Sequence, residues 1–337
     1  MRILIAGLGS IGRRHLRNLM ALGQHDLVLY RTGRSTLPDD ELAGLPVETD
    51  LAAALGRQPQ AVIVANPTAL HLEVAVPAAR QGCHLLLEKP VSHSLAGLAE
   101  LEQAAAASGA RVLVGFQFRF HPGLRRAARL LAEGAIGRPV YARAHWGEYL
   151  PGWHPWEDYR ASYSARADLG GGVLLTLCHP FDYLRWLLGE VEAVAATAGT
   201  YGDLGLEVED TAEVALDLRG GALAAVHLNY LQRPPAHTLE IVGAQGTLRW
   251  DNADGGVRWW SEAAGAWRHE PAPEGFERNT LFLEEMRHFL AVAAGEAEPV
   301  CTLEDGRAAL AIALAARRAA DEGRHLRPDR FLKEGHR

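Results

Sequence analysis

The stretch Met1-Arg-Ile-Leu-Ile-Ala-Gly-Leu-Gly-Ser-Ile-Gly12 decides how the first third of the chain folds. A short apolar run, typical of a buried strand, leads into Gly-x-Gly-x-x-Gly and then into a helical pattern that begins near Ile11. Gly7 is expected to make a tight turn, Gly9 to let the backbone approach a pyrophosphate, and Gly12 to let the helix pack close to the strand. The stretch therefore predicts that a dinucleotide binds at a helix N-terminus, where backbone N–H groups and the helix dipole favour an anion.

Short apolar runs alternate with helical patterns through the first third of the chain. Such alternation indicates parallel strands joined by helical crossovers, and continuously apolar strands indicate a sheet covered on both faces. The sequence thus predicts a doubly wound Rossmann domain over residues 1–122. The expected strands are Arg2–Ala6, Asp26–Tyr30, Ala61–Ala65, His84–Leu87 and Arg111–Gly115, and the expected helices are Ile11–Ala21, Leu51–Leu55, Leu70–Gln81 and Leu95–Ser108.

The pattern changes after about Gly123, and residues 123–337 are expected to form a second α/β domain. Strand-like runs separated by short turns, with no helix of length between them, predict a large, open, mostly antiparallel sheet. The last helix is expected to be able to pack against the first domain. The expected elements are helices at Leu124–Glu133, Gly172–Leu188, Thr280–Ala294 and Leu303–Ala320, a strand at Pro139–Trp146, and several strands between Val191 and Trp260.

Composition excludes several classes of protein. The net charge of −7, without a basic stripe, argues against binding to nucleic acid. The three cysteines are far apart, which suits a reducing compartment, and no histidine pair has metal-ligand spacing, so no metal is expected. The apolar runs are too short to cross a bilayer, and the N-terminus has no signal-peptide pattern. A cytoplasmic protein without a membrane partner is expected.

The end of the second expected strand bears on which nucleotide is preferred. It reads Tyr30-Arg-Thr-Gly-Arg-Ser35, without the carboxylate that would hold the ribose hydroxyls of NAD. Arg31, Thr32 and Arg34 suit the additional phosphate of NADP, because arginine binds phosphate through a forked pair of donors. Alternatively, Arg31 stacks on the adenine and Arg34 is only solvated. NADP is favoured over NAD.

A charged pair, Glu88-Lys89, directly follows a buried apolar strand. In a doubly wound sheet the carboxyl ends of the strands open onto the ligand crevice, which would bring Lys89 near the nicotinamide. A lysine there can stabilise a developing alkoxide. The alternative is a surface lysine beyond a strand end.

Several motifs in fixed order resemble one family, the glucose–fructose oxidoreductase/inositol dehydrogenase/rhizopine-catabolism (Gfo/Idh/MocA) family of NAD(P)-dependent oxidoreductases. The resemblance covers essentially the whole chain. The motifs are Gly7-Leu-Gly-Ser-Ile-Gly12, Asn66-Pro-Thr-Ala-Leu-His71, Glu88-Lys-Pro90, Phe116-Gln-Phe-Arg-Phe-His-Pro122 and Gly170-Gly-Gly-Val-Leu-Leu-Thr-Leu-Cys-His-Pro-Phe-Asp182.

The resemblance implies a Rossmann domain followed by an α/β domain whose open sheet is commonly used to form homo-oligomers, here a dimer or tetramer. It also implies substrates that are sugars, sugar acids, nucleotide sugars or cyclitols. The family's catalytic lysine falls on Lys89 and its helix histidine on His179. Together with the glycine motif, the cofactor-binding residues are expected to be Gly7, Gly9, Ser10, Ile11, Gly12, Arg31, Thr32, Arg34, Asn66, Pro67, Thr68, His71, Glu88 and Lys89.

Thr176, His179 and Asp182 are spaced by three, so they are expected to line one helical face. A histidine near neutral pKa can accept the alcohol proton as hydride leaves for the nicotinamide. Many members of the family have an aspartate where Thr176 stands, so His179 is expected to rely on Asp182 or to work with a lower pKa. Pro180 removes one helix hydrogen bond and is expected to kink the segment. A buried histidine with only a structural role is the alternative.

The stretch Trp146–Tyr163 is rich in aromatic residues. Trp153, Tyr159 and Arg160 would suit a sugar ring that carries a carboxylate or phosphate, and Arg119 is a further candidate for substrate binding. Packing of this loop on the sheet, or at a subunit interface, explains the aromatic residues equally well.

The leading hypothesis is an enzyme that transfers hydride between NAD(P) and a secondary alcohol or ketone of a sugar-like ring. One alternative is internal redox cycling with a tightly bound cofactor. Another is a non-catalytic, cofactor-sensing regulator, against which the presence of Lys89 and His179 argues.

Overall fold

The computed structural model describes residues 1–33, 37 and 40–329. The chain forms two compact units. The first comprises Met1–Phe116 and Asn279–Arg307, and the second comprises Gln117–Arg278 and the segment that begins at Ala308. The predicted domain boundary after residue 122 stays a prediction.

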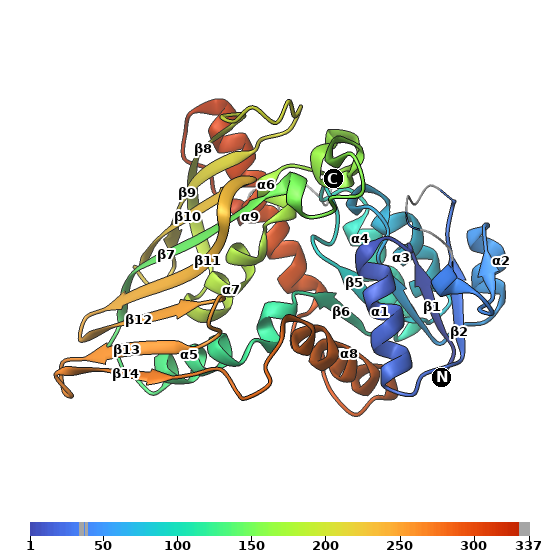
Figure 1. The fold of residues 1–337 in the computed structure, drawn as a ribbon, viewed down its shortest axis with the longest axis horizontal. Coiled ribbons are helices and arrows are strands. Elements are labelled where there is room, and N and C mark those ends of the chain that lie inside the picture. The colour runs from blue at the N-terminus through green and yellow to red at the C-terminus, as the bar shows by residue number, and fades with distance from the viewer. Residues whose placement is uncertain (34–36, 38–39, 330–337) are drawn as a thin grey trace. The chain divides into compact units, whose positions relative to one another are not determined.

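The first unit contains a parallel sheet with the strand order β3-β2-β1-β4-β5-β6, as expected of a Rossmann fold (Figure 1). Strands β1, β4 and β6 are buried along their whole length and β2 and β5 at all but one residue, because helices cover both faces. The strands are β1 (Ile3–Ala6), β2 (Leu27–Tyr30), β3 (Val47–Glu48), β4 (Ala61–Val64), β5 (His84–Glu88) and β6 (Val112–Gly115). The short strand β3 was missed because its two residues are partly exposed and carry no apolar run.

Helices of the first unit cross between these strands. Since such crossovers are right-handed and the strand order reverses direction between β1 and β4, the helices that follow β1 and β4 lie on opposite faces of the sheet. The helices are α1 (Ser10–Ala21), α2 (Leu51–Gly56), α3 (His71–Arg80), α4 (Leu98–Ser108) and α8 (Arg278–Ala294).

Helix α8 comes from far along the chain and lies beside α1 (Figure 1). The Asn279 side-chain amide donates a hydrogen bond to the Asn18 side-chain oxygen at 2.9 Å. The Arg14 guanidinium lies 4.5 Å from the centre of the Phe282 ring. Residues near position 280 therefore complete the core of the N-terminal fold.

The second unit contains an eight-stranded sheet with the order β14-β13-β12-β11-β7-β10-β9-β8. Only β7 and β10 pair in parallel, so the predicted mostly antiparallel sheet is confirmed. The strands are β7 (Pro139–Tyr149), β8 (Val191–Gly199), β9 (Thr211–Leu218), β10 (Leu223–Asn229), β11 (Leu231–Gly243), β12 (Gly246–Asp251), β13 (Val257–Ser261) and β14 (Ala266–Glu270). Strand β14 was missed because all five of its residues are exposed and lack apolar alternation.

Helices pack on this sheet, with α5 against β12 and β13, and α7 against β7. The helices that belong wholly or partly to the second unit are α5 (Pro122–Ala132), α6 (Val173–Thr176), α7 (His179–Leu188) and α9 (Leu303–Glu322). Short 3₁₀ helices lie at Asp40–Leu42, Thr68–Leu70, Gln117–Phe120, Leu150–Gly152, Tyr159–Ala161, Tyr163–Ala165 and Ala167–Leu169.

The predicted continuous helix over 172–188 is wrong, because the chain forms two helices there. The first ends at Thr176 and the second starts at His179, with Pro180 in its first turn. Proline lacks an N–H and is tolerated at a helix start but not in a helix interior. The expected disturbance at Pro180 is therefore a complete break.

None of the helices in the described ranges combines the length and the apolar character that crossing a membrane requires.

Candidate functional site

The glycine motif forms a turn in which two of the three glycines are tightly packed and the third faces open space. Gly7 has φ +94°, and a Cβ built on it would lie 2.4 Å from the backbone nitrogen of Asn66. A Cβ on Gly12 would lie 1.9 Å from the carbonyl oxygen of Gly7. A Cβ on Gly9 meets no atom within 4 Å. Close packing therefore requires glycine at 7 and 12, whereas the space beyond Gly9 is open to a ligand.

The loop after β4 is held by its own side chains. The Asn66 side-chain amide donates to the Leu70 carbonyl at 2.9 Å, and Nε2 of His71 donates to the Asn66 carbonyl at 3.0 Å. Burial lowers the pKa of His71, partly countered by the charge of Glu88, which favours the neutral ring. Thr68 is buried and Pro67 is half-buried. The side chains of Asn66 and His71 thus fix the shape of the loop beside the glycine turn.

The end of β2 carries Arg31 and Thr32. The backbone N–H of Arg31 donates to the Glu48 carbonyl at 3.1 Å, and Thr32 is exposed. The Glu48 carboxylate accepts two hydrogen bonds from Arg57, at 2.9 and 2.6 Å, so its charge is paired. Arg34 lies outside the described residues.

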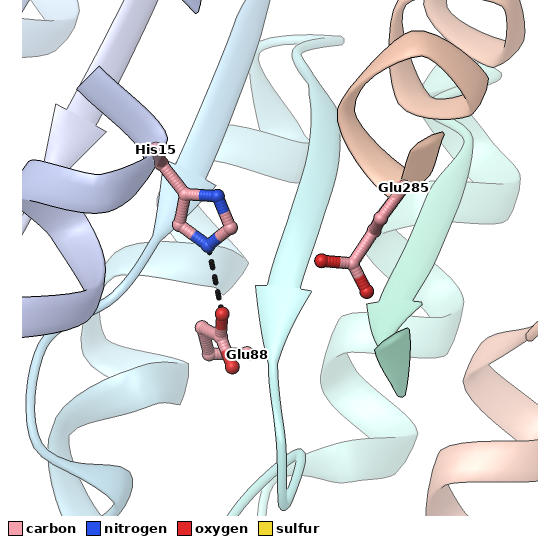
Figure 2. A group of neighbouring side chains, drawn as sticks. All are labelled: His15, Glu88 and Glu285. Atoms are coloured by element: carbon pink, nitrogen blue, oxygen red, sulfur yellow. Dashed lines mark hydrogen bonds and ion pairs between the residues drawn. The ribbon is translucent and has the colours of Figure 1, made fainter. Parts of the chain in front are cut away.

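Glu88 ends β5 with its side chain turned into the core, where it is 7% exposed. Its carboxylate accepts a hydrogen bond from Nε2 of His15 at 2.7 Å, shown in Figure 2, and a second from the backbone N–H of Lys89 at 3.2 Å. Burial alone would raise the pKa of Glu88, but the hydrogen bond and charge of His15, with the charge of Lys89, lower it. The ionised Glu88 therefore anchors the backbone at Lys89.

Lys89, which is half-buried, shares one edge of the sheet with the glycine turn. Gly7, Arg31 and Lys89 directly follow β1, β2 and β5, and Asn66 lies two residues beyond the end of β4, the fourth of these neighbouring parallel strands. Because the carboxyl ends of parallel strands meet at the same edge, these residues border the crevice where the strand order reverses. The first unit thus combines the glycine turn with a cationic side chain at one edge of its sheet.

His179 is the first residue of α7 and is 1% exposed. The Phe118 ring meets the imidazole edge-on, with ring centres 4.9 Å apart, and the Trp146 ring centre lies 5.3 Å away. Two aromatic walls therefore orient the imidazole.

Arg119 and Asp182 form a buried ion pair. Nη2 of Arg119 donates to Asp182 at 2.7 Å, and Nε donates at 3.0 and 3.2 Å. Asp182 is therefore the counter-ion of Arg119, and Arg119, expected to bind substrate, has its charge paired in the core. The expected single face of Thr176, His179 and Asp182 is wrong, because Thr176 belongs to the preceding helix.

Sequence reasoning missed a cluster of aromatic and histidine rings around Phe118. The Trp146 and His237 rings stack with centres 4.3 Å apart, and the two residues are direct partners across β7 and β11. Burial lowers the pKa of His121 to about 4 and that of His237 well below its usual value. Both rings are therefore neutral near pH 7, and Nδ1 of His121 accepts a hydrogen bond from the Gly123 N–H at 3.0 Å.

The aromatic loop packs on its own unit. The Tyr159 hydroxyl donates to the Leu204 carbonyl at 2.9 Å, and the Arg160 guanidinium lies 4.5 Å from the centre of the Tyr159 ring. Trp153 meets the buried Tyr230 edge-on, with ring centres 5.6 Å apart. Trp153 and Tyr159 are half-buried and Arg160 is exposed, so packing accounts for the two aromatic rings and leaves the guanidinium accessible.

A parallel sheet with a glycine turn and a lysine at its crevice, followed by an α/β unit with a large open sheet, defines the class of dinucleotide-dependent oxidoreductases. Comparison with known proteins agrees. Residues 1–116 match the oxidoreductase family with an NAD-binding Rossmann fold, and residues 124–249 match the GFO/IDH/MocA C-terminal domain. The chain belongs to the Gfo/Idh/MocA family of oxidoreductases.

Individual relatives differ in how much of the chain they match. Myo-inositol 2-dehydrogenase of Thermotoga maritima is 28% identical over 98% of this chain and 100% of its own length. An uncharacterized oxidoreductase of Synechocystis sp. is 32% identical, but the match spans only 56% of this chain and 54% of that protein. Among solved structures, levoglucosan dehydrogenase in complex with NADH and levoglucosan has a TM-score of 0.85 at 20% identity, covering 97% of this chain and 99% of that one.

Proposed function

We propose that this protein transfers hydride between a nicotinamide dinucleotide and a secondary alcohol or ketone carbon of a sugar, sugar acid, nucleotide sugar or cyclitol. The observation that carries the proposal is the position of Lys89, which follows β5 at the sheet edge that bears the glycine turn and is anchored through its backbone to Glu88. Two relatives support the substrate class, since one is a myo-inositol 2-dehydrogenase and another is bound to levoglucosan.

The glycine turn fits a dinucleotide. The space beyond Gly9 is open, and the first turn of α1 presents backbone N–H groups that have no partner within a helix. When bound, the nicotinamide supplies the carbon that accepts or donates the hydride. The chain's part is to hold the pyrophosphate with backbone donors at Gly9, Ser10 and Ile11.

We infer that NADP is preferred over NAD. Arg31 stands at the end of β2, where other dinucleotide sites bind the ribose, and Glu48 beside it is already paired with Arg57. An arginine at this position favours an extra phosphate, because its guanidinium binds phosphate through a forked pair of donors. The levoglucosan dehydrogenase structure holds NADH, and titrating this protein with NADP and with NAD tests its own preference.

The proposed roles of the two catalytic residues follow from their chemistry. The Lys89 ammonium stabilises the negative charge that develops on the substrate oxygen. His179, with its ring oriented by Phe118 and Trp146, accepts the hydroxyl proton during oxidation and returns it during reduction. Arg160, the accessible cation of the aromatic loop, is the candidate to contact a substrate carboxylate or phosphate.

Self-association as a dimer or tetramer through the eight-stranded sheet stays a prediction. Light scattering that measures the particle mass would test it, and a monomer at micromolar concentration would contradict it.

The proposed function is tested by incubating the protein with NADP or NAD and a panel of sugars, sugar acids and cyclitols, while following absorbance of the reduced nicotinamide. We expect at least one pair to give reduced nicotinamide in molar excess over enzyme. Lys89→Met should lower turnover by at least about a hundredfold, the lower end of acid–base contributions, with dinucleotide affinity nearly unchanged. Equal turnover in this variant would refute the role of Lys89.

A further inference from the structure

Glu285 is a carboxyl group placed in an apolar core. It lies on the face of α8 that carries Leu281, Phe282, Met286 and Phe289, all of which are buried. Its exposed fraction is 0%. Within the described part of the chain, neither of its carboxyl oxygens has a hydrogen-bond partner. An ionised carboxylate in such surroundings is strongly disfavoured, because it has left water without gaining compensating contacts.

The neighbours of Glu285 are the groups that anchor Lys89. Figure 2 shows the Glu285 carboxyl turned from α8 toward the pair formed by His15 on α1 and Glu88 on β5. One donor atom from each of the three side chains lies within 4.8 Å of the other two. The charge of Lys89 helps to lower the pKa of Glu88, and the charge of Glu88 in turn acts on His71 and on the Glu285 carboxyl, raising the pKa of each.

Glu88 and Glu285 differ in how their carboxyl groups are compensated in the core. Both oxygens of Glu88 already accept hydrogen bonds, one from His15 and one from the Lys89 backbone N–H. Glu285 has no such compensation, and a second carboxylate beside Glu88 would add like-charge repulsion. Burial first, and the charge of Glu88 second, raise the pKa of Glu285 well above its usual value. A single proton on Glu285 removes the conflict and leaves Glu88 ionised.

We propose that Glu285 is a proton-bearing positioning residue. Its carboxyl is protonated in the folded protein at neutral pH and so allows the ionised Glu88 to hold Lys89 in place. The protonation of Glu285 is independent of the reaction, whereas its importance for Lys89 rests on the proposed function. The three side chains also have the donor types that bind a divalent cation, and such an ion would contradict the proposal because it would require the ionised form of Glu285.

The first test measures how unfolding depends on pH in Glu285→Gln, whose neutral amide imitates the protonated acid. The control is Glu284→Gln, the same change at the next residue, whose side chain is 42% exposed and pairs with Arg287. Since the folded pKa of Glu285 is raised, the native chain holds one proton more than the unfolded chain from about pH 4.5 upward, and stability falls as pH rises. Relative to Glu285→Gln, the unfolding constant of the wild type should rise by about tenfold per pH unit in this range.

A second measurement observes the proton directly. The infrared carbonyl stretch of a protonated carboxylic acid should be present in the wild type and in Glu284→Gln at neutral pH, and absent from Glu285→Gln. Absence of this band from the wild type, or a stoichiometric metal ion removed by a chelator, would overturn the proposal. So would parallel pH dependence of unfolding in the wild type and Glu285→Gln.

The positioning role of Glu285 is tested separately, by the pH dependence of kcat. The kcat of Glu285→Gln should remain within about threefold of the wild type below neutral pH, since the substitution is neutral and nearly isosteric. At alkaline pH, ionisation of Glu285 should lower kcat in the wild type and in Glu284→Gln but not in Glu285→Gln. Identical alkaline profiles would refute the link to Lys89. If no variant turns over any polyol, the proposed function fails while the infrared and unfolding results still decide the protonation of Glu285.

Discussion

Replacing Gly9 by alanine should separate dinucleotide binding from folding. A Cβ at this position meets no protein atom within 4 Å, so no steric cost to folding is expected. Gly9 is the N-cap of α1, where alanine is worse than glycine by roughly 0.5–1 kcal/mol. Loss of glycine's freedom in the unfolded chain offsets this by about 0.4–1 kcal/mol. The free energy of unfolding without ligand should therefore change by less than about 0.5 kcal/mol.

The same Cβ projects into the space proposed for the pyrophosphate, and we expect dinucleotide affinity to fall at least about tenfold, or 1.4 kcal/mol. At a dinucleotide concentration of about 100 Kd, binding stabilises the wild type by about 2.7 kcal/mol, whereas a tenfold weaker variant gains only about 1.4 kcal/mol. Since 1 kcal/mol corresponds to roughly 2–4 °C, the ligand-induced rise in Tm should drop from about 5–11 °C to about half.

The assay is thermal unfolding with and without NADP, combined with calorimetric titration. Gly56→Ala is the matched control, because Gly56 also has open space around its Cβ position but ends α2, away from the turn. Unchanged NADP affinity in Gly9→Ala would refute the assignment of this turn to the pyrophosphate. A large loss of stability without ligand would refute the conclusion that a Cβ at position 9 has no steric cost to folding.

Three further predictions concern the cofactor, the core and pH. Arg31→Ala should weaken NADP binding by about tenfold or more, the contribution of one charge-assisted hydrogen bond, but should weaken NAD binding by less than about threefold. Equal losses of affinity for the two dinucleotides in a titration would contradict the preference for NADP. Arg119→Leu leaves Asp182 buried without its partner and should cost about 3–5 kcal/mol in urea unfolding, whereas Arg166→Leu, which breaks an exposed pair with Asp168, should cost far less. Because the folded pKa of His121 is lowered to about 4, the unfolded chain binds a proton there from about pH 6.5 downward and the folded chain does not. The free energy of unfolding should thus fall between about pH 6.5 and 4 by up to roughly 3 kcal/mol, and this part of the fall should vanish in His121→Gln.

Much of the fold could be predicted because short sequence motifs and the order of strands and helices along the chain indicated the same architecture. The glycine motif followed an apolar strand, and the alternation of strands and helices predicted the parallel sheet that the structure contains. The helix break at Pro180 was only partly foreseen, since the sequence shows that proline disturbs a helix but not whether neighbouring contacts preserve it. Strands β3 and β14 carry no apolar pattern and are held by pairing with their neighbours.

The surroundings of the candidate site were harder to predict because they depend on contacts between distant residues. His237 stacks on Trp146 through the register of β11 on β7, which no short motif records. Asp182 pairs with Arg119 across 63 positions of sequence. Glu285 did leave a signal, a carboxyl on the apolar face of a helical pattern, but its neighbours His15 and Glu88 come from the other end of the chain. Motifs indicated the candidate reactive groups, whereas only the structure shows which side chains contact those groups.

The central claim is that hydride passes directly between a ring carbon and the nicotinamide. The most direct test uses an active polyol that carries deuterium on the carbon to be oxidised, with mass spectrometry of the nicotinamide produced. We predict that the reduced dinucleotide gains one deuterium per molecule and that Lys89→Met forms the same labelled product far more slowly. Deuterium that remains in the polyol while the dinucleotide binds but is never reduced would contradict the claim.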